Sequence, residues 1–136
     1  MRSIYKRFDH LLKLKYNIVQ VPMGLGYFSK DVEPDMDGPT AQLVRDLISR
    51  NNIVIFSKST CPYCKMAKEI FDSINCRYTS IELDQREDCA EIQSVLKKMT
   101  GAKTVPRVFV NGDCIGGGTD VKRLHEDGNL LPLLQK

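Results

Sequence analysis

Two hydrophobic spacings, one helical and one strand-like, alternate along the chain from residue 40 onwards. The first segment predicts a helix with Thr40 as its N-terminal cap, because apolar residues recur every three or four positions. Its apolar face consists of Leu43, Val44, Leu47 and Ile48. The run 53–56 is apolar without interruption, which is typical of a central strand covered on both faces. These elements begin a domain in which helices and strands take turns.

A second helix is predicted from Pro62 and a second strand over residues 78–83. The inner face of that helix consists of Met66, Ala67, Ile70, Phe71 and Ile74. Asp88 and Glu91 have the spacing of a capping box at the start of a third helix. The buried face of this third helix is predicted to be Ile92, Val95, Leu96 and Met99.

The last third of the chain predicts a hairpin and a final helical stretch. Strands over 107–110 and 113–115 flank Asn111-Gly112, a strong turn signal, and Thr119 can cap the last helix. The order of elements is therefore α-β-α-β-α-β-β-α. We expect an α/β domain with a four-stranded mixed sheet sandwiched by helices.

The first 39 residues have a different composition. Residues 1–30 carry six basic side chains against the single acid Asp9, in an amphipathic pattern typical of organelle-targeting segments. A tail without a targeting role is the alternative. Residues 31–39 are acidic and contain Pro and Gly, so they read as a linker. We predict an extension and linker over 1–39 and the folded domain over 40–136.

Composition narrows the classes of function. The chain is 42% hydrophobic and 27% charged, and no apolar run approaches the roughly 20 residues that span a bilayer. The net charge of +3 and the lack of a basic block argue against nucleic acid. Five cysteines cannot all pair within one chain, so we expect a reducing compartment, either cytoplasm or mitochondrion. No membrane or nucleic-acid partner is expected, and the protein is expected to be a monomer.

The segment Cys61-Pro62-Tyr63-Cys64 carries the chemistry. Cys61 follows a predicted strand and precedes Pro62, a residue suited to the first position of a helix. Free backbone N–H groups at a helix start favour the thiolate, the nucleophilic form of cysteine. Cys64 lies one turn further into the helix. We therefore predict Cys61 as the nucleophile and Cys64 as the resolving thiol.

A structural metal site is the main alternative for this cysteine pair. One Cys-x-x-Cys supplies two ligands, whereas a zinc site needs four. Cys76, Cys89 and Cys114 are isolated in the sequence, so we expect no metal. We read these three cysteines as core or surface residues.

With these motifs, residues 40–136 resemble a dithiol glutaredoxin of the thioredoxin superfamily. The matching segments are Phe56–Cys64, Lys98–Gly101, Thr104–Pro106 and Gly116–Asp120. A thioredoxin usually has Trp before Cys-Gly-Pro-Cys, and this chain contains no Trp. The resemblance implies the thioredoxin fold and glutathione as co-substrate.

The resemblance also implies a glutathione site. Lys58 and Gln93 match positions at the glycine end of the tripeptide, and Tyr63 matches a position beside it. Pro106 should be the family's cis-proline, which exposes the backbone of Val105 to pair with glutathione like an added strand, with Thr104 flanking that contact.

The γ-glutamyl end is implied to lie at the start of the last helix. Gly117 and Gly118 permit close backbone approach, and Thr119 and Asp120 lie at the helix N-terminus. We read Arg107, which follows the proline, as a surface arginine.

The predicted function is glutathione-dependent reduction of protein disulfides and of glutathione mixed disulfides. Its expected partners are glutathione and disulfide-containing or glutathionylated proteins. Two alternatives stay open at this point. One is an iron–sulfur-binding glutaredoxin that acts as a carrier or sensor. Pro62 argues against this alternative, because in the glutaredoxin family a proline at this position is associated with redox-active rather than cluster-binding members. The other is a thioredoxin-like reductant served by a flavoenzyme.

Overall fold

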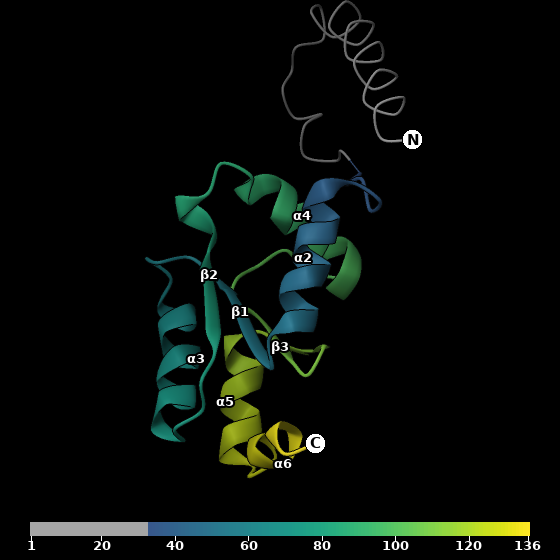
Figure 1. Ribbon diagram of the computed structural model, residues 1–136. Coiled ribbons are helices and arrows are strands. Elements are labelled where there is room, and N and C mark those ends of the chain that lie inside the picture. The colour runs from purple at the N-terminus through teal and green to yellow at the C-terminus, as the bar shows by residue number, and fades with distance from the viewer. Residues whose placement is uncertain (1–32) are drawn as a thin grey trace, which may run out of the picture. The chain divides into compact units, whose positions relative to one another are not determined.

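The computed structural model describes residues 33–136, and Pro34–Lys136 form one compact unit (Figure 1). Its elements in chain order are α2 (Pro39–Arg50), β1 (Ile53–Ser57), α3 (Pro62–Ser73), β2 (Thr79–Glu82), the 3-10 turn η2 (Leu83–Gln85), α4 (Cys89–Thr100), β3 (Arg107–Val110), β4 (Asp113–Gly116), α5 (Gly118–Glu126) and α6 (Leu130–Leu134). The amphipathic pattern predicted near the N-terminus lies outside the described residues. Among the described helices, none has the length and apolarity needed to cross a bilayer.

The four strands form one mixed sheet in the order β2-β1-β3-β4. β1 pairs in parallel with β2 and antiparallel with β3, and β3 pairs antiparallel with β4. Every residue of β1 is buried, as the uninterrupted apolar run predicts for a central strand. The predicted mixed sheet between helices is confirmed.

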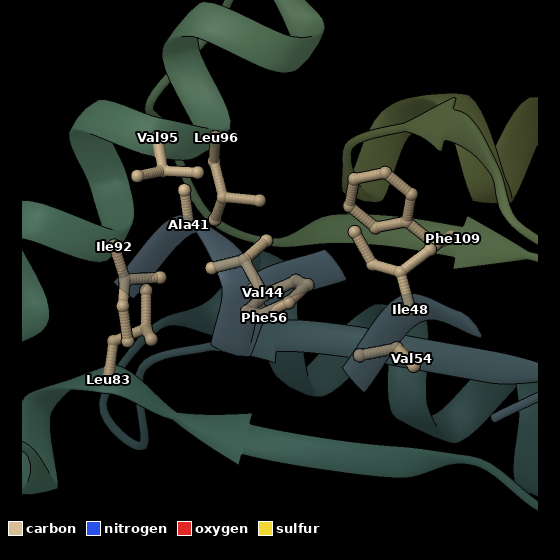
Figure 2. Close-up of a cluster of buried hydrophobic side chains, with 10 residues drawn as sticks. All are labelled: Ala41, Val44, Ile48, Val54, Phe56, Leu83, Ile92, Val95, Leu96 and Phe109. Atoms are coloured by element: carbon tan, nitrogen blue, oxygen red, sulfur yellow. The ribbon is translucent and has the colours of Figure 1, made fainter. Parts of the chain in front are cut away.

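Two buried clusters hold the helices against the sheet, one on each face. Figure 1 shows α3 and α2 on opposite sides of the sheet. Because side chains alternate along a strand, Val54 and Phe56 of β1 pack with residues of α2 and α4, whereas Ile53 and Ile55 pack with residues of α3 and α5. The α2/α4 cluster, drawn in Figure 2, consists of Ala41, Val44, Ile48, Val54, Phe56, Leu83, Ile92, Val95, Leu96 and Phe109. The α3/α5 cluster consists of Ile53, Ile55, Phe71, Val108, Val110, Val121 and Leu130. Each face of the sheet is thus covered.

The hairpin between β3 and β4 turns where the sequence predicts it. Asn111 and Gly112 have φ angles of 49° and 91°, and such positive values at both central residues suit the twist of a hairpin. The final helical stretch divides into α5 and α6 at Gly128, whose φ is 75°. Glycine adopts this left-handed conformation without steric penalty, so Gly128 suits the turn that follows the end of α5 at Glu126.

The structure corrects three predicted caps and one core position. The cap of α2 is Gly38, and Thr40 is buried within the first turn. Asp88 is at the cap of α4 but makes no capping bond, because its carboxylate accepts from Arg86 instead. Met99 is 39% exposed, since the last turn of α4 extends past the α2/α4 cluster. The third predicted cap, Thr119, lies inside the first turn of α5 (Gly118–Glu126), whose N-cap is Gly117.

Candidate active site

Cys61 is the N-cap of α3, and a short turn over residues 58–60 connects it to the end of β1. Its backbone is extended, with φ −87° and ψ 119°, and its N–H donates to the Lys58 carbonyl at 3.0 Å. Pro62 occupies the first helical position, where it leaves no N–H unsatisfied. The Cys61 side chain is half-buried at a helix N-terminus, a position that favours an anion. This is the placement predicted from the sequence.

Cys64 lies one turn further along α3 and is only 1% exposed. Burial raises the pKa of its thiol above the ordinary value, and the neighbouring Cys61 acts in the same direction. Hydrogen bonds from the Lys58 backbone and the Ser57 hydroxyl oppose this rise in pKa. The two cysteines therefore differ in solvent access, and Cys64 is held predominantly as a neutral thiol at neutral pH.

The loop before β3 packs against the Cys61 sulfur. The Cys61 Sγ lies 3.7 Å from the Val105 carbonyl oxygen, although the two residues are 44 positions apart. The Val105–Pro106 peptide bond is cis, as predicted. Pro106 is buried, Val105 is half-buried and Thr104 is exposed. The structure thus brings the Thr104–Pro106 segment to the predicted nucleophile.

The start of α5 meets the same part of α3. A Cβ atom on Gly118 would lie 2.9 Å from the Tyr63 carbonyl oxygen, so this close approach requires glycine. Tyr63 itself is 55% exposed. The N-cap of α5 is Gly117, whose N–H donates to Asp120 Oδ2 at 2.8 Å. Thr119 is exposed inside the first turn of α5, so the prediction that it caps this helix is wrong.

Known proteins resemble this arrangement in sequence and in structure. The family model described as Glutaredoxin matches residues 53–115. Glutaredoxin-C4 of Arabidopsis thaliana is 42% identical over 118 residues, which is 87% of either chain. The chain belongs to the glutaredoxin family. Members of this family are thiol–disulfide oxidoreductases.

Other glutaredoxins match a smaller share of the chain. Mitochondrial glutaredoxin-2 of Homo sapiens is 52% identical over 93 residues, which is 68% of this chain and 57% of that protein. The chain therefore matches less than two thirds of the length of these mitochondrial relatives. The buckwheat glutaredoxin–glutathione complex is 44% identical with a TM-score of 0.69, covering 71% of this chain and 87% of that one. The expected thioredoxin fold is confirmed.

Two further residues implied by the glutaredoxin resemblance have partners within the chain. Gln93 Nε2 donates to the Lys103 carbonyl at 2.9 Å, and its Oε1 lies 3.4 Å from the Cys89 sulfur. Lys58 is half-buried. Its charge helps to lower the pKa of Asp84, after the larger effect of hydrogen bonds from Ser59. The structure thus places Lys58 in the turn between β1 and α3 and anchors Gln93 to the loop before Thr104.

Arg107 makes contacts within the chain that the reading as a surface arginine does not predict. It is half-buried, and its Nε donates to the carbonyls of Thr104 at 3.1 Å and Pro106 at 3.3 Å. Its guanidinium also lies close to Gly117. Arg107 therefore links the cis-proline loop to the start of α5. The sequence offered a signal for this linking role, because Arg107 directly follows the Thr-Val-Pro motif.

A polar pair, the buried Ser57 and the half-buried Glu82, lies next to the turn that leads to Cys61 and was not predicted from the sequence. Ser57 at the end of β1 is fully buried, and its hydroxyl donates to Glu82 Oε1 at 2.9 Å. Glu82 is paired through its other oxygen with Lys68 Nζ at 2.7 Å. One signal was available, since a lone serine that ends a buried apolar run needs a polar partner.

The remaining three cysteines lie outside the Cys61–Cys64 pair, although the Cys89 sulfur is 3.4 Å from Gln93 Oε1. Cys76 and Cys89 are half-buried and Cys114 is exposed, and all three are free thiols. Over residues 33–136, no group of three or more His, Cys, Asp or Glu side chains is arranged to hold a metal ion. Cys89 packs against the α2/α4 cluster, Cys76 packs against the α3/α5 cluster, and Cys114 lies at the surface.

Proposed function

We propose that this chain is a dithiol glutaredoxin that reduces glutathione mixed disulfides and protein disulfides with glutathione as co-substrate. The observation that carries the proposal is the difference in burial between Cys61 and Cys64 across the first turn of α3. A half-exposed sulfur at a helix N-terminus suits attack on a substrate. A buried thiol one turn away suits the later, intramolecular step.

With a glutathione mixed disulfide, the Cys61 thiolate attacks the glutathione sulfur. A bond forms between Cys61 and glutathione, the substrate sulfur–glutathione bond breaks, and the substrate leaves as a thiolate that takes up a proton. A second glutathione thiolate then attacks the same glutathione sulfur. This step forms oxidised glutathione and returns Cys61 as a thiolate.

With a protein disulfide, Cys61 first forms a mixed disulfide with the substrate. Cys64 then attacks the Cys61 sulfur, so that the Cys61–Cys64 bond forms and the reduced substrate leaves. Glutathione regenerates the dithiol. Cys64 is required for this branch alone.

The proposed glutathione site extends from the α3 start to the α5 start. Contacts within the described chain bring Cys61 to Val105 and Tyr63 to Gly118, which supports one continuous surface. The buckwheat relative was solved as a complex with glutathione. The residues proposed to bind are Lys58, Tyr63, Gln93, Thr104, Val105, Pro106, Gly117, Gly118, Thr119 and Asp120.

Turnover of a glutathione mixed disulfide in a coupled glutathione reductase assay tests the proposal. We expect Cys61→Ser to lose the catalysed rate, because the attacking sulfur is gone, and Cys64→Ser to keep deglutathionylation while losing catalysed reduction of a protein disulfide. Cys114→Ser, at an exposed and isolated thiol, is the matched control and should match the wild type. Catalysis by Cys61→Ser, or loss of all turnover in Cys64→Ser, contradicts the roles. Reduction of a protein disulfide without glutathione would favour the thioredoxin-like alternative.

We also propose a mitochondrial location. The basic amphipathic pattern over residues 1–30 supports it, as do the mitochondrial glutaredoxin-2 relatives. Residues 1–39 fused to a fluorescent protein should direct it to mitochondria, and exchange of Arg2, Lys6 and Arg7 for Gln should abolish the import. A cytoplasmic signal from the unaltered fusion would contradict the proposal.

Cluster binding is the second candidate, because the holo form of poplar glutaredoxin C1 is a structural relative, 38% identical with a TM-score of 0.70. A bridged cluster would take one cysteine and one glutathione from each of two chains. Anaerobic reconstitution with iron, sulfide and glutathione tests it. A visible absorption band together with a dimer on sizing would favour this candidate, and a colourless monomer would exclude it.

A further inference from the structure

Arg107 begins β3, and its side chain turns back toward the cis-proline loop that precedes this strand. Its backbone is held in the sheet by pairing with Phe56 of the buried strand β1. Its Nε donates to the carbonyl of Thr104 at 3.1 Å and to that of Pro106 at 3.3 Å. One end of the guanidinium is thus fixed between a rigid strand and the loop.

The other end of the guanidinium reaches the start of α5. A Cβ atom on Gly117 would lie 2.9 Å from Arg107 Nη2 and 3.4 Å from the Pro106 carbonyl oxygen. The Gly117 N–H donates to Asp120 Oδ2 at 2.8 Å, and Arg123 donates to Asp120 Oδ1 at 2.7 Å. The start of α5 is therefore fixed by its own side chains and also lies against the Arg107 guanidinium.

The chemistry of arginine suits a link between two segments. A guanidinium is planar and carries five N–H groups in a fixed arrangement, so it holds groups on two sides at a constant spacing. A lysine has the same charge but donates from a single nitrogen on a flexible stem. Here the Nε of Arg107 binds the loop carbonyls and its Nη2 meets Gly117, so this side chain sets the spacing between the loop and α5.

We propose that Arg107 is a positioning residue that makes the chain selective for the γ-glutamyl group of glutathione. The inference rests on the proposed function, in which the backbone of Val105 pairs with glutathione and the start of α5 receives the γ-glutamyl end. These two parts of glutathione are joined covalently, so both bind at once only where the spacing of the two protein segments matches.

This spacing acts on the reacting sulfur. The Val105 carbonyl oxygen lies 3.7 Å from Cys61 Sγ, so the segment that pairs with glutathione also lies at the nucleophile. A γ-glutamyl group bound at the correct distance from Val105 therefore places the glutathione sulfur for attack. Correct placement of reacting groups lowers the barrier of such a step, and a small displacement raises it again.

A single exchange step isolates this effect. The Cys61 thiolate attacks the peptide sulfur of a mixed disulfide between a peptide thiol and a coloured aromatic thiol. The bond from Cys61 to the peptide forms, the peptide–aromatic disulfide bond breaks, and the aromatic thiol leaves as a thiolate with the electron pair. Arg107 neither gives nor takes a proton. All chains carry Cys64→Ser, so that no second thiol releases colour.

Two substrates in stopped flow measure the selectivity. One contains glutathione, and the other contains N-acetyl-cysteinylglycine, which keeps the cysteine amide, the glycine carboxylate and the net charge of glutathione. The second peptide lacks the amino and carboxylate groups of the γ-glutamyl residue. At low substrate concentration, the ratio of the two second-order rate constants reports how strongly the γ-glutamyl group is used in the transition state.

Arg107→Met keeps the aliphatic stem of the side chain and removes its donors. We expect the rate with the glutathione substrate to fall about tenfold, the effect of losing one aligned hydrogen bond to a charged group. The rate with N-acetyl-cysteinylglycine should change by less than about twofold, because this peptide does not use the α5 start. Arg107→Lys should lose selectivity as well, since it keeps the charge but not the planar fork.

Arg45→Met is the matched control. Arg45 is also half-buried, and its Nη2 donates to the Met36 carbonyl at 2.8 Å, but it lies on α2, which contributes no residue to the proposed site. This variant removes the same charge and should keep both rates.

Gly117→Ala disturbs the link from the other side. Its new methyl group would displace the guanidinium, so selectivity should fall. The Arg107→Met chain lacks the displaced nitrogen, so the two changes together should cost less selectivity than the product of their separate effects.

The outcomes separate the inference from the proposed function. Selectivity lost in Arg107→Met and Arg107→Lys but kept in Arg45→Met supports the inference. An equal fall of both rates, full selectivity in Arg107→Lys, or independent effects of Arg107→Met and Gly117→Ala overturns it. If the chain with Arg107 attacks the glutathione substrate no faster than Cys61→Ser does, the proposed function itself fails.

Discussion

At the scale of single residues, one helical turn separates two thiols with different environments. Cys61 is half-buried at the cap of α3, whereas Cys64 is 1% exposed with a pKa raised by burial. The sequence predicts this difference because it depends on local helix geometry. The contact between Ser57 and Glu82 could not be predicted in the same way. These residues are 25 positions apart and meet only through the register of β1 with β2.

Glu82 gives a residue-scale prediction about pH. Its pKa in the folded chain lies below its usual value, so the folded state binds fewer protons than the unfolded chain around that pH. The stability that it contributes is present above the unfolded pKa of about 4.3 and is lost as pH falls through the folded value. We expect the free energy of unfolding to fall more steeply between about pH 5 and pH 3 in the wild type than in Glu82→Gln.

Urea denaturation at several pH values measures this difference. Asp84 and Asp88 also have lowered pKa values, and both chains retain them, so the difference between the chains isolates Glu82. Lys68→Met is a second variant, which removes the partner of Glu82 without removing the carboxylate. Parallel curves for wild type and Glu82→Gln would show that the folded environment does not stabilise the Glu82 carboxylate.

At the scale of elements, the helices and strands follow from their hydrophobic periods, while their exact ends do not. The hairpin at Asn111-Gly112 could be predicted because both residues suit its backbone angles. The cap of α2 and the capping bond of α4 could not be predicted, because other residues compete with Thr40 for the cap position and with the helix N–H groups for the Asp88 carboxylate. Asp88 binds Arg86, and a turn ending at Gly38 starts α2 early enough to bury Thr40.

The approach of α5 to α3 gives an element-scale prediction. Gly118→Ala would place a Cβ 2.9 Å from the Tyr63 carbonyl and 3.1 Å from its Cβ, so the two helix starts must separate. We expect a loss of about 1–3 kcal/mol in the free energy of unfolding, the usual range for overpacking. Thr119→Ala, one residue on and exposed, should change it by less than about 0.5 kcal/mol.

Urea denaturation of both variants measures these losses. Equal stability of Gly118→Ala and wild type would mean that α5 can shift without cost. The glutathione KM of Gly118→Ala is a second measurement, because this residue lies in the proposed binding surface.

At the scale of the whole molecule, the buried structure is built from residues of one unit. The α2/α4 cluster and the α3/α5 cluster both lie within Pro34–Lys136 and cover opposite faces of the sheet. The alternation of helices and strands predicts this layering. It does not predict which side chains meet between layers, as the exposed Met99 shows.

The core gives a whole-molecule prediction for a shortened chain. Residues 34–136 should fold alone, with a midpoint of thermal unfolding within about 4 °C of the full chain, a change of less than about 1 kcal/mol. Circular dichroism on both chains measures the two midpoints. Phe71→Ala in the shortened chain is the control for sensitivity, because loss of a fully buried phenylalanine costs about 3–5 kcal/mol. A large drop on shortening would show that the first 33 residues support the fold.

The burial of Cys64 also makes it a reporter of local opening. In a Cys61→Ser chain, an alkylating reagent can reach the Cys64 sulfur only when the first turn of α3 or the whole domain opens. The rate of alkylation, divided by the rate for the unfolded chain, then gives the free energy of that opening. Oxidants in the cell meet the same barrier. The stability of a helix end thus protects the Cys64 sulfur from overoxidation, and any change that frays α3 would expose it.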